Sequence, residues 1–262
     1  MSATVTRISM TPVKGLALHH PEEVELTPSG VPGDRTFFLV DQHGRLISAT
    51  RLGALVSARA VHDADAGTLS LAFAGGDVVR DVIDVGESEP VRFFGLRLEA
   101  MPVRGPFSAA LSELTGVPVR LMLRPPTRPG VDRGATGAVT LISGASLRRL
   151  AAQAGAETID GRRFRMTFEL DGVDAHAEDD WVGGEVAVGD ARVRITGHVG
   201  RCALTTRNPD TGDVDFPTLR VLRDYRGEVP STEPLAIGVA AAVVRPGRVR
   251  VGDAVAVVDG AG

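Results

Sequence analysis

The residue types with the clearest chemical potential gather around the only cysteine of the sequence, Cys202. Arg201 directly precedes it, and a neighbouring positive charge favours the thiolate, the form of cysteine that binds metals. A soft thiolate is also the ligand that a redox metal would select from this sequence. The alternative is a small buried hydrophobic residue in a strand, a common environment of a free cysteine. The residue types alone leave both interpretations open.

The rest of the sequence argues against several other kinds of site. One cysteine cannot form an internal disulfide or supply the four thiolates of an all-cysteine iron–sulfur cluster. The six histidines contain neither an i,i+4 pair nor an HExxH motif, so a histidine-based zinc site is not expected. Dinucleotide, P-loop and Gly-x-Ser-x-Gly motifs are absent. The acidic run at 178–180 fits a solvated loop better than a cation site.

Lys14 is the only lysine among 29 basic residues, in a sequence otherwise biased towards arginine. Lysine and arginine differ in shape and hydration, so a retained lysine indicates a position where arginine cannot substitute. Chance is the alternative interpretation of this count.

Composition and charge indicate an ordinary globular protein. Of the 262 residues, 43% are hydrophobic and 24% are charged, and the net charge of -4 provides no basic field for nucleic acid or an anionic membrane. No apolar run approaches the length of a membrane span, and residues 1–10 show no signal-peptide pattern. We therefore expect a cytoplasmic protein that binds neither nucleic acid nor membrane.

Short β-branched segments punctuated by Gly, Pro and Asp predict a fold of sheets or barrels. The segment 4–10 is strand-like, although Val5 falls on the same face as Arg7 and Ser9. Further expected elements are hairpins over 37–50 and 69–79, a single strand over 92–99, and a closing turn and strand over 247–257.

Two helices are expected, at 107–115 before Gly116 and at 146–154 before Gly155. Between them, the Pro-rich segment 124–130 predicts a stiff polar loop. These elements place a domain boundary near 105–120.

Motifs in both halves of the chain resemble the MOSC family, named after the C-terminal domain of molybdenum cofactor sulfurases. The C-terminal motifs are Gly200–Arg201–Cys202, Thr205–Thr206, Asn208–Pro209–Asp210–Thr211–Gly212, Leu222–Arg223–Asp224–Tyr225–Arg226 and Gly247–Arg248–Val249–Arg250–Val251–Gly252–Asp253. The N-terminal motifs are Pro12–Val13–Lys14–Gly15, Gly33–Asp34–Arg35, Phe38–Leu39–Val40–Asp41 and Ala49–Thr50–Arg51. Within the family, the sequence is most similar to the mitochondrial amidoxime-reducing components and their bacterial relatives.

The resemblance implies a mainly β fold with a few helices (α+β). Residues 1–105 would form the MOSC N-terminal β-barrel-like module and residues 106–262 the MOSC domain. The two parts would hold a molybdenum–molybdopterin cofactor between them.

The resemblance also implies the site residues. Cys202 would be the catalytic residue and the molybdenum ligand. The cations of Lys14, Arg35 and Arg165 suit the cofactor phosphate, although Lys14 and Arg35 could instead be surface residues and Arg165 could pair with Glu169. The full expected cofactor-binding set is Lys14, Arg35, Ser143, Arg165, Thr167, Gly200, Arg201 and Cys202.

Three positions depart from the family pattern: Gly15 replaces a serine, Met166–Thr167 replaces a Pro-Asn pair, and His198–Val199–Gly200 stands where relatives carry a small polar residue. The first two remove or weaken hydrogen-bond donors towards the cofactor.

The implied activity is that of an oxidoreductase that reduces N-hydroxylated or N-oxide small molecules. Its electrons would come from a separate ferredoxin- or cytochrome-type donor protein. Two alternatives remain: a non-catalytic carrier of the cofactor or of sulfur on Cys202, and a metal-free family member recruited to a specialised pathway. Lys14 is the only possible Schiff-base lysine and belongs to the N-terminal motifs, so pyridoxal phosphate chemistry is not expected.

Overall fold

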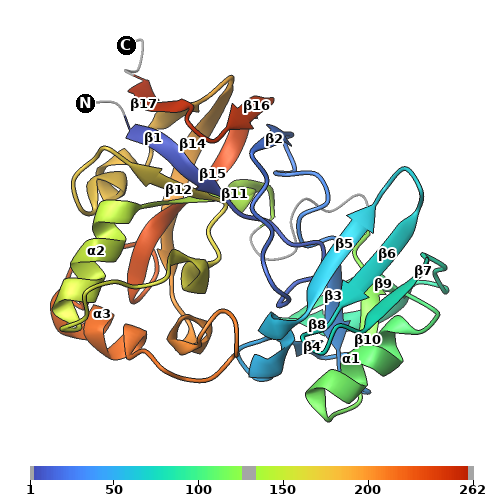
Figure 1. The fold of residues 1–262 in the computed structure, drawn as a ribbon. Coiled ribbons are helices and arrows are strands. Elements are labelled where there is room, and N and C mark those ends of the chain that lie inside the picture. The colour runs from blue at the N-terminus through green and yellow to red at the C-terminus, as the bar shows by residue number, and fades with distance from the viewer. Residues whose placement is uncertain (1–2, 126–133, 259–262) are drawn as a thin grey trace.

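The computed structural model describes residues 3–125 and 134–258, which form a mostly β structure with three α-helices. The predicted fold class is confirmed. The strands form two bodies: a closed barrel on the left of Figure 1 and a group of smaller sheets on the right.

The larger body is a closed barrel of seven strands. Its interior is filled by small and β-branched side chains such as Val193, Ile195 and Ala241, all fully buried. Neighbouring strands are antiparallel, except for β11 and β12, which are parallel. Around the barrel, the strands are β1 (Ala3–Ile8), β12 (Phe168–Asp171), β11 (Val139–Ser143), β15 (Ala236–Arg245), β14 (Ala191–Gly200), β13 (Glu185–Val188) and β17 (Ala254–Val258).

The smaller body combines a five-stranded sheet and a three-stranded sheet over one hydrophobic core that includes Phe37, Leu55 and Phe107. The five-stranded sheet has the order β4 (Leu46–Ile47), β3 (Phe37–Val40), β10 (Arg120–Leu123), β9 (Leu96–Pro102) and β8 (Glu89–Phe93). The three-stranded sheet consists of β5 (Arg59–Asp63), β6 (Thr68–Ala72) and β7 (Val78–Val82).

The two bodies do not follow the order of the chain. β1 belongs to the barrel, and β2 (Glu23–Leu26) pairs with β16 (Gly247–Arg250) near the C-terminus. In the other direction, β10 and α1 (Phe107–Thr115) pack with the N-terminal sheets. The boundary between residues 105 and 106 stays a prediction.

Two of the three helices were expected. α1 has the predicted bounds and ends at Gly116, which adopts a left-handed conformation with φ 68°. α2 (Gly144–Gln153) begins two residues earlier than predicted, because the Ser143 hydroxyl caps it. α3 (Thr218–Arg226) was not predicted; it follows Pro217 and buries only a narrow stripe that includes Val221 and Leu222.

The predicted single strand over 92–99 is wrong. β8 and β9 form an antiparallel hairpin, and Phe94–Gly95 is its turn. Both residues have positive φ, 47° and 85°, the backbone of a two-residue hairpin turn that twists with its strands. Such turns usually carry Asn or Gly at the first position, so Phe94 is a weak local signal of a turn.

The imperfect alternation of the first strand has a structural cause. The pairing register of β1 with β12 shifts between Val5 and Arg7. This irregularity lets Val5 and Ile8 both reach the barrel core, so a strict two-residue period fails there.

Most of the predicted loop at 124–130 lies outside the described residues, and only Arg124 and Pro125 are seen, after the end of β10. No helix within 3–125 and 134–258 is long and apolar enough to span a membrane.

Candidate functional site

A cavity of about 970 Å³ lies between the two bodies and takes its walls from both of them. The smaller body contributes the loops around Lys14, Arg35 and Thr50, and the barrel body contributes the segments around Arg165 and Cys202. We call this cavity the cleft. Its volume is within the range of small-molecule and cofactor sites.

Backbone hydrogen bonds between two loops place Lys14 and Arg35 in the cleft. The Arg35 amide donates to Thr11 O at 2.6 Å, and the Thr11 amide donates to the Asp34 carboxylate at 2.8 Å. The Lys14 amide donates to Phe37 O at 2.8 Å. The motifs at 12–15 and 33–35 therefore form one unit, and both of its cations line the cleft.

Arg35 and Arg165 hold the two bodies together at the cleft. Arg35 Nη2 donates to Arg165 O at 2.9 Å, and Arg165 Nη2 donates to Leu16 O at 2.7 Å. Both arginines have positive φ, 48° and 53°, a conformation that is unfavourable for residues other than glycine. Backbone strain of this kind is concentrated at ligand-binding sites, and here it occurs at two neighbouring cations.

The Lys14 ammonium lies over aromatic rings of the β8–β9 turn, 5.3 Å from the centre of Phe94 and 5.8 Å from the centre of Phe93. Phe94 is 68% exposed and lines the cleft. Its ring limits the directions in which the lysine side chain can extend.

Cys202 is exposed and lines the cleft, so the alternative of a buried residue within a strand is wrong. It lies two residues beyond the end of β14 and directly precedes the short 3₁₀ helix Ala203–Thr206. The Thr50 hydroxyl of the smaller body lies 3.6 Å from its sulfur.

The chain after Cys202 is fixed against the smaller body. Leu204 packs on the core of that body, and Arg207 donates two hydrogen bonds to Thr50 O, at 3.0 and 3.3 Å. At Gly53 and Gly212 the two backbones approach so closely that a Cβ on either would lie 2.4 Å or less from a carbonyl oxygen of the other. The sequence needs glycine at both positions for this approach.

Three other predicted residues line the cleft but use their polar groups within the protein. The Gly200 amide donates to Glu233 Oε2 at 2.7 Å. The Thr167 hydroxyl accepts from the Thr140 amide at 3.1 Å. Arg201 donates to Ile237 O at 3.0 Å, to Phe164 O at 3.1 Å and to Met166 Sδ at 2.9 Å.

Ser143 requires a correction, because it does not line the cleft. It is fully buried, and its hydroxyl accepts from the Ser146 amide at 3.0 Å as the cap of α2. Its amide donates to the buried carboxylate of Glu178, whose pKa is raised by burial. The acidic run at 178–180 is thus not a solvated loop, since Glu178 is buried and Asp179 pairs with Arg226 at 2.5 Å.

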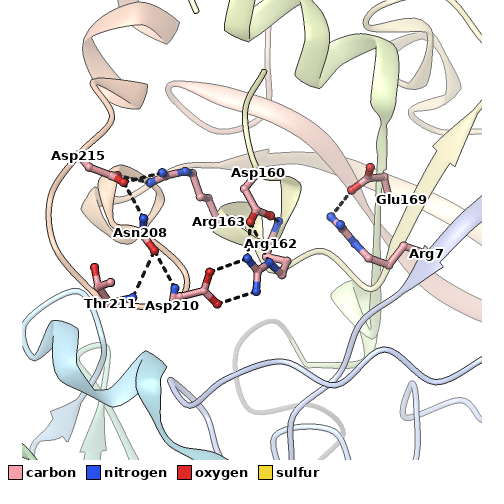
Figure 2. Close-up of polar contacts among 9 residues, drawn as sticks. All are labelled: Arg7, Asp160, Arg162, Arg163, Glu169, Asn208, Asp210, Thr211 and Asp215. Carbon is pink, nitrogen blue, oxygen red and sulfur yellow. Dashed lines mark hydrogen bonds and ion pairs between the residues drawn. The ribbon is translucent and has the colours of Figure 1, made fainter. Parts of the chain in front are cut away.

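The alternative partner considered for Arg165 is engaged elsewhere. Glu169 forms an ion pair with Arg7 of β1, at the right of Figure 2. Burial raises the pKa of this carboxyl.

Ion pairs clamp the turn at 208–212 to the segment that leads into Arg165 (Figure 2). Arg162 contacts Asp160 at 2.6 Å and Asp210 at 2.8 Å. The next residue, Arg163, binds Asp215 through two hydrogen bonds of 2.6 and 3.0 Å. These ion pairs connect the segment that follows Cys202 with the segment that precedes Arg165.

The two arms of this clamp should differ in their contribution to stability. Arg163 is 8% exposed at its side chain, so replacing Asp215 by Ala leaves a buried cation without its partner. We expect the free energy of unfolding to fall by about 1.5–3 kcal/mol. Replacing Asp210, which is 66% exposed, should cost less than about 1 kcal/mol.

Urea unfolding of both variants measures this difference. The hydrogen bonds from Arg163 lower the pKa of Asp215. The ion pair therefore adds to the free energy of unfolding at pH values above 3.8, the ordinary pKa, and this contribution is lost as the pH falls below that value. The difference in free energy of unfolding between wild type and Asp215→Ala should therefore become smaller in acid. An equal loss of unfolding free energy in the Asp215 and Asp210 variants at neutral pH would contradict the larger contribution of the Arg163–Asp215 pair.

Several residues that line the cleft were not singled out in the sequence: Asp34, Thr50, Phe94, His198 and Glu233. Asp34, Thr50 and His198 stand inside the motifs or departures quoted above, yet nothing in their spacing gives them a role. Phe94 and Glu233 carry no local signal, because only the tertiary fold brings them to the cleft.

The mainly β fold agrees with the family comparisons. The family model of the MOSC N-terminal beta barrel domain matches residues 2–116, and that of the MOSC domain matches residues 129–256. The chain belongs to the MOSC family and carries both domains.

The relatives of the chain include an amidoxime-reducing component and a molybdenum cofactor sulfurase. The chain is 27% identical to mitochondrial amidoxime-reducing component 1 of Homo sapiens, over 96% of this chain and 82% of that protein. It is 24% identical to molybdenum cofactor sulfurase of Danio rerio, over 86% of this chain and 31% of that protein. Among solved structures, the YUAD protein from Bacillus subtilis aligns with a TM-score of 0.46 and 11% identity, over 97% and 94% of the two chains.

Proposed function

We propose that this protein binds a molybdenum–molybdopterin cofactor in the cleft and uses it to reduce N-hydroxylated or N-oxide substrates. One observation carries the proposal: a single cavity between the two bodies contains an accessible thiol, Cys202, together with the cations Lys14, Arg35 and Arg165. The residues are distant in sequence and come from both bodies. Arg35 also pairs with Asp34, and the three cations together make this part of the cleft favourable for an anion, which supports a phosphate site.

The donor set fits a cofactor that brings its own metal. Cys202 would supply the protein ligand, as a soft thiolate suited to a redox metal. Lys14, Arg35 and Arg165 would bind the phosphate through charge-assisted hydrogen bonds. The described residues contain no group of three His, Cys, Asp or Glu side chains that could hold a metal ion by themselves.

The other predicted residues would shape the cleft. Thr167, Gly200 and Arg201 line its wall, and Arg201 holds the backbone carbonyls of Ile237 and Phe164 by hydrogen bonds. The protein would thus provide position and charge, and the cofactor would provide the redox chemistry.

The overall reaction consumes two electrons and two protons. The N–O bond of the substrate breaks and the oxygen leaves as water. The nitrogen gains a hydrogen in place of the hydroxyl group of an N-hydroxylated substrate, or a lone pair in place of the oxygen of an N-oxide. We propose that a separate ferredoxin- or cytochrome-type protein supplies the electrons, since the only cysteine of the chain is assigned to the cofactor. The same proposal includes a cytoplasmic location and no nucleic-acid or membrane partner.

Purification from a host that makes the cofactor tests this function. The expected result is bound molybdenum near one atom per chain and reduction of an N-hydroxylated amidine with a chemical reductant. Molybdenum without turnover would favour a carrier of the cofactor. A protein without molybdenum or turnover would refute the proposal and favour a metal-free member of the family.

A further inference from the structure

The side chain that meets the Cys202 sulfur comes from the other body of the protein. Thr50 Oγ1 lies 3.6 Å from Cys202 Sγ, within hydrogen-bonding distance for sulfur, although the residues are 152 positions apart. Both residues line the cleft.

The backbone on each side of this contact is fixed. Thr50 O accepts two hydrogen bonds from Arg207, at 3.0 and 3.3 Å. Cys202 O accepts from the amide and the hydroxyl of Thr205, at 3.1 and 3.0 Å, and Thr205 is buried. Rotation about the Cα–Cβ bond of Cys202 is then the main freedom that the sulfur retains, and a hydrogen bond to the sulfur restricts that rotation.

We propose that Thr50 is a positioning residue that orients the Cys202 sulfur and donates a hydrogen bond to it in the thiolate form. A thiolate has no hydrogen, so in a metal-bound state the Thr50 hydroxyl must be the donor. Hydrogen bonds to a ligand sulfur withdraw electron density and tune the reduction potential of the metal that it binds. The smaller body would thus adjust the electronic properties of a ligand carried by the barrel body.

Infrared spectroscopy of the metal-free protein tests the contact directly. Because Cys202 is the only cysteine, the S–H stretching band of the whole protein reports this one thiol. Thr50→Val removes the hydroxyl while keeping the shape of the side chain, and we expect it to shift the band. Thr50→Ser, which retains the hydroxyl, should leave the band near its wild-type position.

Thr68→Val provides the matched control, because Thr68 lies on β6 in the same body and does not line the cleft. Its band should coincide with that of the wild type. A band at the wild-type position in Thr50→Val would overturn the proposal. If Thr50→Val does not fold, Thr50→Ala gives the same comparison.

The consequence at the metal rests on the proposed function and is measured separately. In molybdenum-loaded protein, Thr50→Val should lower the reduction potential of the bound metal and keep the molybdenum content within about twofold of the wild type. Thr50→Ser should restore the potential. If the wild-type protein binds no molybdenum, the proposed function fails, while the infrared comparison still decides the contact. An unchanged potential in loaded Thr50→Val would overturn the tuning role.

Discussion

Replacing Cys202 by Ser is expected to abolish molybdenum-dependent reduction while leaving the fold nearly intact. Serine is almost isosteric with cysteine, but its hydroxyl is a hard donor that stays protonated at neutral pH, so the soft metal–thiolate bond is lost. The side chain is exposed and belongs to no hydrophobic core cluster.

The assay compares bound molybdenum, turnover with an N-hydroxylated amidine and a chemical reductant, and urea unfolding of both proteins. The free energy of unfolding should stay within about 0.5 kcal/mol of the wild type, the usual range for surface substitutions. Wild-type turnover in Cys202→Ser would rule out the thiolate as an essential ligand.

Replacing Arg35 by Ala should lower cofactor retention by roughly ten- to a hundredfold. The substitution removes a charged hydrogen-bond donor worth about 1.5–3 kcal/mol. It also removes the hydrogen bond to Arg165 O, which holds the strained backbone of the second arginine. Turnover per loaded molecule should change much less than loading, because Arg35 would bind the phosphate and not the metal.

Two further variants separate loss of charge from backbone strain. Alanine at a φ of 48° is strained, whereas glycine is not, so Arg35→Gly removes the side chain without that penalty. Arg35→Ala and Arg35→Gly should lose cofactor to a similar degree, as judged by molybdenum per chain after gel filtration. Arg80→Ala, an exposed arginine on β7, serves as the control for a general loss of positive charge. Full retention in Arg35→Gly would show that the cation is not a phosphate ligand.

Local patterns predicted the elements whose signals lie within a few residues of one another. The hairpin of β3 and β4 and the helix α1 each begin and end at turn or cap residues that can be read directly, such as Gly44 and Gly116. α3 was missed because tertiary packing, and not a strong apolar face, stabilises it. The pairing of β1 with β12 joins residues at least 160 positions apart, and no local pattern specifies it.

In the site, too, local motifs predicted some residues, while others are recognised only in the folded structure. The family resemblance implied Cys202, Lys14, Arg35 and Arg165 as site residues, and all four line one cleft in the structure. The resemblance implied Ser143 as well, yet its hydroxyl caps a helix. Thr50 also stood in a quoted motif, but its contact with sulfur exists only after the two bodies have docked.

The barrel is closed by the pairing of β1 with β17, the first and the last strand within the described residues, at Ala3–Val255 and Thr4–Ala254. On the ribosome, the nascent β1 must wait until the chain has been synthesised through β17 before it finds this partner. The contact order of the barrel is correspondingly high, and such topologies fold slowly because distant segments must meet before any contact stabilises them. A fragment that begins at residue 106 would lack β1 and expose two unpaired strand edges, β12 and β17, to aggregation.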